Sequence, residues 1–309
     1  MRALEELRFV VAGAYVLDCF VNTKRLPAWG QTVEARSILT TPGGKALNQA
    51  VALARLGAQV NAVGVVGDDG PGRAVLAALL RERVDVSWVE ARADAATTIC
   101  LCFVSDQGDS AIMWHIDDDV AVRPETVRVA EPAFDRADAV LLTFEPPPLA
   151  IRETIRVARR GGGLVFVQSA PVLAEAADAL SLPWDQVDVL VPNEIEARAL
   201  LRGGGRLAVE DLAGALADQL GVRMVVVTLG PSGCVAHLNG AIYSFPAQEK
   251  RVVDATGASD AFVAALAAQL TAGVVAADAI EVAQSVAARS IQRAGSHESM
   301  PYAKGSSPR

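Results

Sequence analysis

The chain has 309 residues, of which 51% are hydrophobic and 21% charged, and its formal net charge is -8 with a pI of about 5.0. Such a chain can bury a large core and is typical of one sizeable α/β domain spanning residues 1–309. No segment clusters the Lys and Arg side chains that bind phosphate backbones, so we expect no nucleic-acid partner.

The cysteines and the apolar segments indicate a protein of the cytoplasm. Cys19, Cys100, Cys102 and Cys234 show no CxxC spacing, which predicts reduced thiols and no structural zinc site. The start MRALEELRF is acidic where a secretory signal would be cationic and then apolar, so export is not expected. The run AFVAALAAQLTAGVVAA contains polar residues, which predicts a buried helix and no membrane partner.

In chain order, residues 14–41 are predicted to form short alternating strands without an intervening helix. The segment KALNQAVALARLG then has helical spacing and ends at Gly57. A strand, VNAVGVVG, follows, and DDGPGRAVLAALLRERV reads as a helix with Asp caps and Pro71 near its start.

A second region without helices covers TTICLCFV and SAIMWHI, on either side of a turn, SDQGD, at residues 105–109. Together with residues 14–41, its strands, within about 97–117, predict a small antiparallel lid over a cleft or a dimer contact. Edge hairpins of a larger sheet are the alternative. Cys100 and Cys102 would face the same way, and we interpret them as a buried pair on an apolar face rather than a metal or redox site.

The later strands are nearly continuous apolar runs: AVLLTF, LVFVQS, VDVLVPN and MVVVTLG. Such runs are expected when helices cover both faces of a sheet. The sequence therefore predicts an α/β fold in which a doubly wound, mainly parallel sheet is flanked by helices. The tail KGSSPR is predicted to be disordered.

The stretch VVDATGASDAFVAAL is interpreted as an apolar strand that stops at small residues and restarts as a helix. The first N–H groups of a helix lack partners within the helix, and the helix dipole favours an anion there. Asp260, at this helix entrance, is then either an N-cap or a base acting beside a bound anion.

Four separated motifs decide between these roles: AYVLDCFV, TPGGKALNQAVALARLGA, VPNEIEA with TLGPSG, and DATGASDAF. In this order they make the chain resemble the PfkB carbohydrate kinases, and within them the ribokinases, over nearly its whole length. The resemblance implies a ribokinase-like fold with a β lid, and ATP-dependent phosphorylation of a primary hydroxyl of a small sugar, most simply ribose to ribose 5-phosphate. Two alternatives stay open: an adenosine- or inosine-type nucleoside kinase, with Trp114 and Phe103 stacking the base, and a non-catalytic sugar-binding or regulatory protein.

By the same resemblance, Asp260 takes the proton of the attacking hydroxyl, and Gly257, Ala258 and Ser259 form an anion hole for the migrating phosphoryl group. Ser259 stands where the family usually has glycine, and its Cβ would crowd the phosphate if the backbone needed a positive φ. The implied sugar-binding residues, besides Asp260, are Asp18, Gly43, Gly44, Lys45, Asn48 and Glu145.

The resemblance also implies an ATP site made of Asn193, Glu196, Thr228, Gly230, Gly233 and Gln284, with Mg²⁺ bound to the nucleotide. Gln284 stands where ribokinases usually have Asn beside the adenine. The K⁺ ligands would be Asp254, Thr256, Ser290, Arg293, Gly295 and Ser299, on two segments lying side by side behind the anion hole. Homodimerisation through the lid is a further implication.

Overall fold

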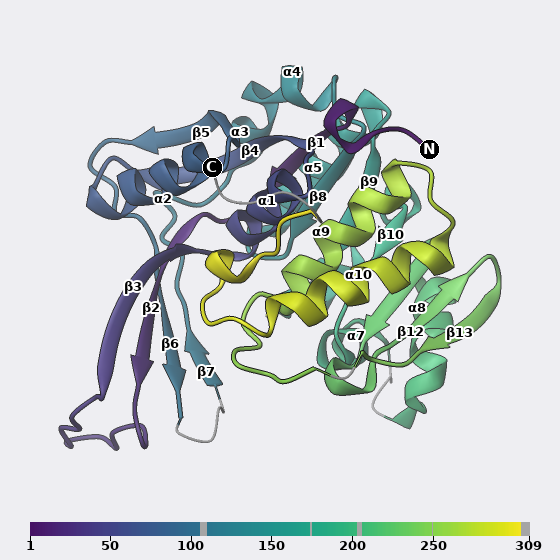
Figure 1. Ribbon diagram of the computed structural model, residues 1–309. Helices are drawn as coiled ribbons and strands as arrows, with labels where there is room; N and C mark the ends of the chain where they lie inside the picture. Colours follow the sequence, from purple (N-terminus) through teal and green to yellow (C-terminus); the bar gives the residue numbers. More distant parts are fainter. Residues whose placement is uncertain (106–109, 174, 203–205, 249, 304–309) are drawn as a thin grey trace.

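The computed structural model describes residues 1–309 except 106–109, 174, 203–205, 249 and 304–309. Among the described residues a large sheet is layered between helices, and a smaller sheet projects from one end of this body (Figure 1). The expected turn at 105–109 falls almost wholly outside the described residues, and so does the tail at 304–309. The smaller sheet is a sheet of its own and not an edge hairpin of the larger one.

The main sheet has the strand order β13-β12-β11-β10-β9-β8-β1-β4-β5. All neighbouring strands from β11 to β5 run parallel, and β12 and β13 add an antiparallel edge. The strands are β1 (Arg8–Ala12), β4 (Gln59–Gly67), β5 (Asp85–Arg92), β8 (Ala139–Thr143), β9 (Leu164–Gln168), β10 (Val189–Leu190), β11 (Met224–Thr228), β12 (Cys234–Leu238) and β13 (Ala241–Phe245). The predicted doubly wound, mainly parallel sheet is confirmed.

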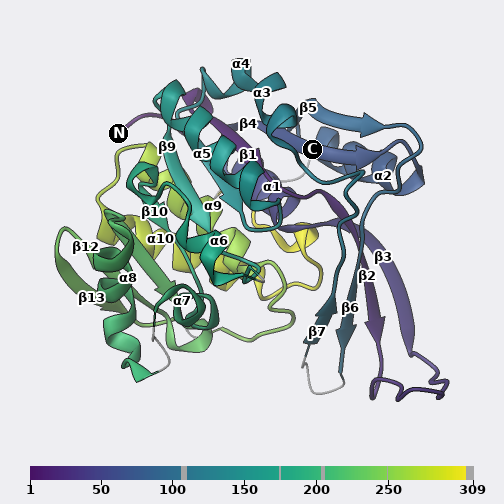
Figure 2. The ribbon, with the colours of Figure 1, turned by 180° about the vertical axis from the view of Figure 1, so that it is seen from behind.

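Helices cover both faces of this sheet, and each face has its own apolar core. One layer holds α1 (Lys45–Arg55), α2 (Gly70–Arg81), α9 (Ala258–Thr271) and α10 (Ala276–Ser290). The other, seen from behind in Figure 2, holds α3 (Pro124–Val129), α4 (Glu131–Phe134), α5 (Pro148–Gly161), α6 (Ala176–Leu180), α7 (Glu194–Leu200) and α8 (Leu212–Leu220). Strands β8 and β9 are buried because helices lie on both sides of them.

Local sequence sets where these helices begin. The Asp69 side chain caps α2 by accepting a hydrogen bond from the Gly72 N–H at 2.7 Å, with Pro71 in the first turn. Helix α9 is the apolar run expected to be buried, and its residues from Asp260 to Ala268 are all buried. In the described part of the chain, none of the helices has the length and apolar character that crossing a membrane requires.

The smaller sheet, here called the lid, has the order β3-β2-β6-β7, with β2 (Val16–Asn22), β3 (Ser37–Gly43), β6 (Ile99–Val104) and β7 (Ser110–Met113). Its strands were expected to be antiparallel, but β2 and β6 run parallel to each other. The reason is that β2 follows β1 and β6 follows β5, and these two strands of the main sheet run in the same direction. Side chains alternate along a strand, so Asp18, Cys100 and Cys102 share one face of the lid.

The apolar strand expected before α9 is not formed. Val252 and Val253 are more than half exposed and belong to an irregular segment. The Val253 N–H donates to the Ile291 carbonyl at 2.7 Å, so this backbone group is paired outside any sheet.

Candidate active site

The start of α9 carries the predicted base. Gly257 precedes the helix in the left-handed region, with φ of 76°, and its carbonyl accepts from the Ala261 N–H at 2.9 Å. The Ala258 N–H donates to the Ala255 carbonyl at 3.2 Å, whereas the amides of Ser259 and Asp260 precede the first i−4 bond of the helix. Two helix-start amides therefore belong to the same helix turn as Asp260.

Ser259 does not create the predicted crowding. It lies within α9, and the positive φ of this turn is at Gly257 instead. The Ser259 side chain is exposed, and its Oγ accepts a hydrogen bond from Gln168 Nε2 at 3.2 Å. A Cβ at position 259 is therefore compatible with the turn.

The start of α1 meets the start of α9. Asn48 Nδ2 donates to Asp260 Oδ2 at 2.8 Å, and both side chains are buried. Gly43 and Gly44 come immediately before this helix, and a side chain at either position would disturb the local structure. A Cβ at Gly43 would lie 1.9 Å from Asp18 Oδ2, and Gly44 has φ of 92°.

Several carboxylates surround the Lys45 ammonium. Burial raises the pKa of Asp18 to about 7, with a further contribution from Asp260, and burial likewise raises the pKa of Glu145 to about 7. Desolvation acts to lower the pKa of Lys45, but Asp260, Glu145 and Glu196 outweigh it, so that pKa is raised. Sequence positions far apart thus form one electrostatic unit around a single cation.

Asp260 itself is held in a low-dielectric environment. Burial raises its pKa, while Lys45 and the side-chain amides of Asn48, Gln168 and Gln49 oppose that rise. Its Oδ1 atom is buried and has no hydrogen-bond partner among the described residues. A carboxylate oxygen in this state is suited to accept a proton or a donor from a bound molecule.

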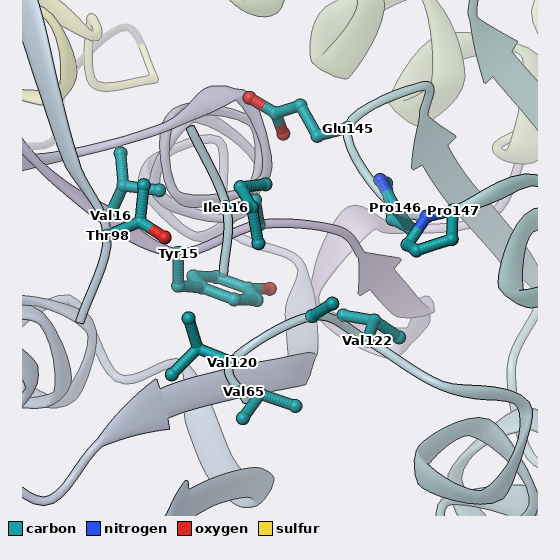
Figure 3. Close-up of a pocket in the computed structure, with 12 residues that line it drawn as sticks. Tyr15, Val16, Val65, Thr98, Ile116, Val120, Val122, Glu145, Pro146 and Pro147 are labelled. Carbon is teal, nitrogen blue, oxygen red and sulfur yellow. The ribbon is translucent and has the colours of Figure 1, made fainter. Parts of the chain in front are cut away.

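Glu145 also forms the polar end of a pocket lined largely by apolar side chains (Figure 3). Tyr15 lies across this pocket, and its hydroxyl donates to the Val11 carbonyl at 2.8 Å. Glu145 Oε2 accepts from Thr143 Oγ1 at 3.1 Å, and Glu145 Oε1 accepts weakly from the Lys45 N–H at 3.4 Å. These bonds aim the carboxylate toward the start of α1.

Three side chains of the site were not predicted. Gln49 Nε2 donates to Gln168 Oε1 at 2.5 Å, and Gln168 in turn reaches Ser259. Glu298 hydrogen-bonds with Thr41 and adds to the raised pKa of Asp18. Gln168 could have been found, because it is a polar residue at the carboxyl end of a buried parallel strand, where ligands bind in such sheets. Nothing in the sequence around Glu298 indicated its role.

On the nucleotide side, Asn193 and Glu196 form a capping box at the start of α7. Glu196 Oε2 accepts from the Asn193 N–H at 2.9 Å, and Asn193 Oδ1 accepts from the Glu196 N–H at 2.9 Å. Asn193 therefore caps a helix whether or not it also contacts a ligand. Glu196 is buried and is one of the carboxylates that raise the pKa of Lys45.

The other predicted nucleotide residues lie around the end of β11. Thr228 pairs with Asn193 in an isolated parallel bridge, which links the two motifs. Gly230 and Gly233 bracket a short 3₁₀ turn, with φ of 55° and 93°. Gln284, on α10, donates from Nε2 to the Phe245 carbonyl at 3.0 Å and thus contacts the end of β13.

The two segments predicted to hold K⁺ are tied together by Asp254. Its Oδ1 accepts from the Thr256 N–H at 2.9 Å and its Oδ2 from the Gly295 N–H at 3.0 Å. Ser290 and Ser299 are fully buried and donate to the Ala287 and Ser296 carbonyls, and Arg293 donates its N–H to the Ser290 carbonyl.

A cation is compatible with this loop. Ser296 Oγ is buried without a partner in the described part of the chain, and the Ser296 carbonyl lies 3.5 Å from where a Cβ on Gly257 would be. Two oxygen atoms of Ser296, one of them unpaired, are thus present in the loop beside Gly257, which is compatible with a bound cation.

Comparisons with known proteins show the family and the fold of the chain. The model of the pfkB family carbohydrate kinases matches residues 7–303. A mouse ribokinase is 30% identical over 307 residues, covering 97% of this chain and 94% of the relative, and a Bacillus subtilis ribokinase is 31% identical over 300 residues. The structure of Arabidopsis thaliana ribokinase complexed with ribose and ATP superposes with a TM-score of 0.80 at 26% identity, covering 96% of both chains.

Proposed function

Because the chain belongs to the pfkB family of carbohydrate kinases, we propose that it transfers the γ-phosphoryl group of ATP to a primary hydroxyl of a small sugar, most simply O5 of ribose. One observation carries the proposal. The buried Asp260 carboxylate, held by Asn48, lies beside the first free amides of α9. A base and an anion-binding group thus share one point, which is the arrangement that phosphoryl transfer to an alcohol requires.

In this proposal the sugar binds between the lid and the start of α1. Asp18, Glu145 and Asn48 hold the hydroxyl groups, since carboxylates and amides accept hydrogen bonds from adjacent hydroxyls. Asp260 Oδ1, which lacks a partner in the described part of the chain, takes the proton of the attacking hydroxyl. The anion hole was predicted at Gly257, Ala258 and Ser259, but the Ala258 N–H already donates to the Ala255 carbonyl. In the proposal the amides of Ser259 and Asp260, with the Lys45 ammonium nearby, therefore stabilise the charge on the transferring group.

ATP enters as its magnesium complex and is therefore a substrate together with its metal ion. Asn193, Glu196 and the turn from Gly230 to Gly233 form the proposed nucleotide side, with Gln284 nearest the base. Since Glu196 is held by Asn193, it would act through metal-bound water rather than as a direct ligand, as suits a strongly hydrated Mg²⁺.

K⁺ is proposed as an activator bound by the loops that Asp254 joins. Bound there, the ion supplies a fixed positive charge that orients the carbonyl dipoles beside Gly257. The geometry of the loops does not depend on the ion, because the Asp254 carboxylate already fixes the relative position of the two segments.

The nucleoside-kinase alternative loses one of its supports. Phe103 pairs with Val21 and Ala111 and so lies on the lid face opposite to Asp18. Within one chain it cannot stack on a base bound beside Asp18. The non-catalytic alternative also loses a support, because the expected crowding of the phosphate by the Ser259 Cβ does not arise within α9. A sugar kinase remains the best supported function.

A homodimer formed through the lid is also proposed. Ile38, Leu39, Ile112 and Met113 are each at least 59% exposed, and they lie on both faces of the lid. Exposed apolar side chains gathered in this way are typical of an interaction surface. A cytoplasmic location is proposed with it, supported by the four free cysteines.

The function is tested by incubating the protein with Mg-ATP and, separately, pentoses, hexoses and nucleosides, and by measuring ADP formation. ADP release with ribose, and ribose 5-phosphate as the product, supports the proposal. Release only with a nucleoside favours the alternative kinase. Thermal stabilisation by a sugar without ADP formation would refute catalysis and support a binding protein.

A further inference from the structure

Two thiols lie beside the sugar-binding carboxylate on the inner face of the lid. Cys100 pairs with Asp18 across β2 and β6, and Cys102 pairs with Phe20 one step further along the same face. One ligand atom from each of Asp18, Cys100 and Cys102 lies within 4.8 Å of the others. The sequence indicated only a buried apolar cysteine pair, because it could not show that Asp18 faces the same side of a parallel neighbour strand.

From this juxtaposition we infer that Asp18, Cys100 and Cys102 form a binding site for a thiophilic divalent cation of the zinc class, and that the cation competes with the sugar. The competition rests on the proposed function, in which Asp18 binds the sugar. The cation-binding part stands without it.

The donor set fits this class of metal. Zn²⁺ binds thiolates at about 2.3 Å and carboxylates at about 2.0–2.2 Å in a tetrahedron, so its ligand atoms lie about 3.5–3.8 Å apart. Small rotations of the three side chains bring their ligand atoms from within 4.8 Å to that separation. Two soft sulfur ligands select zinc or cadmium over the magnesium that accompanies ATP.

The surroundings also favour a cation. Cys100 pairs directly with Asp18 across β2 and β6, and Cys102 lies two residues further along the same strand face, so both thiols lie near the Asp18 carboxylate. Asp18 and Glu145 add negative charge near Cys100, although Lys45 lies close enough to oppose a second cation. A divalent ion bound there would displace the thiol protons and pair with the Asp18 carboxylate.

The site would have an open position toward the cleft. Asp18 and Cys102 are buried, whereas Cys100 is only half-buried. Three protein ligands with an open fourth position leave room for a water molecule. With the metal bound, Asp18 would no longer be free to accept a hydrogen bond from the sugar, so metal and sugar would exclude each other.

Cadmium titration tests the binding directly. Metal-free, reduced protein titrated with CdCl₂ should develop the ultraviolet thiolate-to-cadmium charge-transfer band, saturating at one ion per chain. The band should be lost in C100S/C102S, halved in each single serine variant and retained in C19S/C234S, whose cysteines lie on the outer lid face and on β12. D18N should weaken cadmium affinity by about tenfold or more. A band that persists in C100S/C102S, or that never forms in folded protein, overturns the inference.

Competition is measured on the same samples. The sugar identified by the substrate panel should raise the cadmium concentration needed for half-saturation of the charge-transfer band. In the kinase assay, zinc should inhibit competitively with the sugar at a large excess of Mg-ATP. Each variant is compared with its own metal-free rate, and C100S/C102S should lose the inhibition. If no substrate supports ADP formation, the proposed function fails while the charge-transfer titration still decides the metal site. Inhibition that is competitive with ATP instead would refute the competition.

Discussion

Replacing Asp18 by Asn should stabilise the protein at neutral and alkaline pH while weakening sugar binding. The pKa of the buried Asp18 carboxyl group is about 7, against its ordinary value of 3.8. The folded state therefore binds this proton more tightly than the unfolded state. The contribution of this group to stability is present at low pH and is lost as the pH rises from about 4 through about 7. Asn has nearly the same shape and does not ionise.

The magnitude follows from these two pKa values. Relative to low pH, where Asp18 is protonated in both states, this pKa difference lowers the free energy of unfolding by about 2 kcal/mol at pH 5 and by about 4 kcal/mol at pH 8. The stability advantage of D18N over the wild type should therefore grow by about 2–3 kcal/mol between these pH values. Burial is the main cause of this pKa rise, and repulsion by Asp260 and Glu298 is already part of it.

Urea denaturation followed by tryptophan fluorescence at pH 5, 6, 7 and 8 measures this difference. Asp218→Asn, the same change at an exposed position on α8, serves as the control and should show little dependence on pH. A difference between D18N and wild type that is flat with pH, or that favours the wild type at pH 8, would contradict the proposed burial of charge. In the kinase assay, kcat/KM for the sugar should fall in D18N.

Asp260→Asn keeps an oxygen for Asn48 but removes the proton acceptor, so kcat should fall by about 10²–10⁴-fold with little change in nucleotide affinity; near-normal turnover would exclude Asp260 as the base. Gly257→Ala places a Cβ at φ of 76° and 2.7 Å from Met300 Cε, and should lower both the free energy of unfolding, by about 1–2 kcal/mol, and kcat. The control, Gly30→Ala, lies at φ of 80° with open space around it, and should lose similar stability without loss of kcat. Replacing K⁺ by tetramethylammonium at constant ionic strength should lower the rate, and an unchanged rate would argue against the cation site. I38K/L39K, which charges both lid faces, should shift a sedimenting dimer to monomer, whereas V129E, on α3, should not; a monomeric wild type would refute the dimer.

Much of the order of strands and helices was predictable because apolar runs and helix caps are both local features of the sequence. Apolar runs such as AVLLTF are continuous where helices cover both faces, and caps such as Asp69 mark helix starts within a few residues. Strands β1, β5, β12 and β13 were not predicted. The residues of β5, at an edge of the sheet, are half-buried or exposed and give a weaker signal. The segment at Val252 and Val253 has the composition of a strand, but its backbone pairs with Ile291, and no local pattern could show this.

Most of the predicted site residues came from four motifs, and a hydrogen bond between Asn48 and Asp260 brings two of these motifs into direct contact. What the motifs could not give is the set of contacts made between elements. Gln168 reaches Ser259 from the end of β9, and Glu298 reaches Thr41 from a loop 257 positions later in the chain. Such pairs depend on which strand ends meet at one edge of the sheet, and only the complete topology determines that.

The electrostatics of the site indicate that its carboxylates are placed to contact ligands, because ionising them in this buried position lowers the stability of the fold. Asp18, Glu145, Glu196 and Asp260 all have raised pKa values because burial opposes their ionisation, and they share one ammonium, Lys45. Carboxylates placed for structure alone have lowered pKa values instead, as at Glu153, where two arginines bring the pKa to about 2. Ligands that bring hydroxyl donors or a cation to these carboxylates would favour their ionised forms. Each raised pKa should therefore fall when such a ligand binds, so that uptake of sugar releases protons near pH 7. Calorimetry of sugar binding in buffers of different ionisation enthalpy would detect these protons, and binding without proton release would show that the carboxylates do not ionise on contact with the ligand.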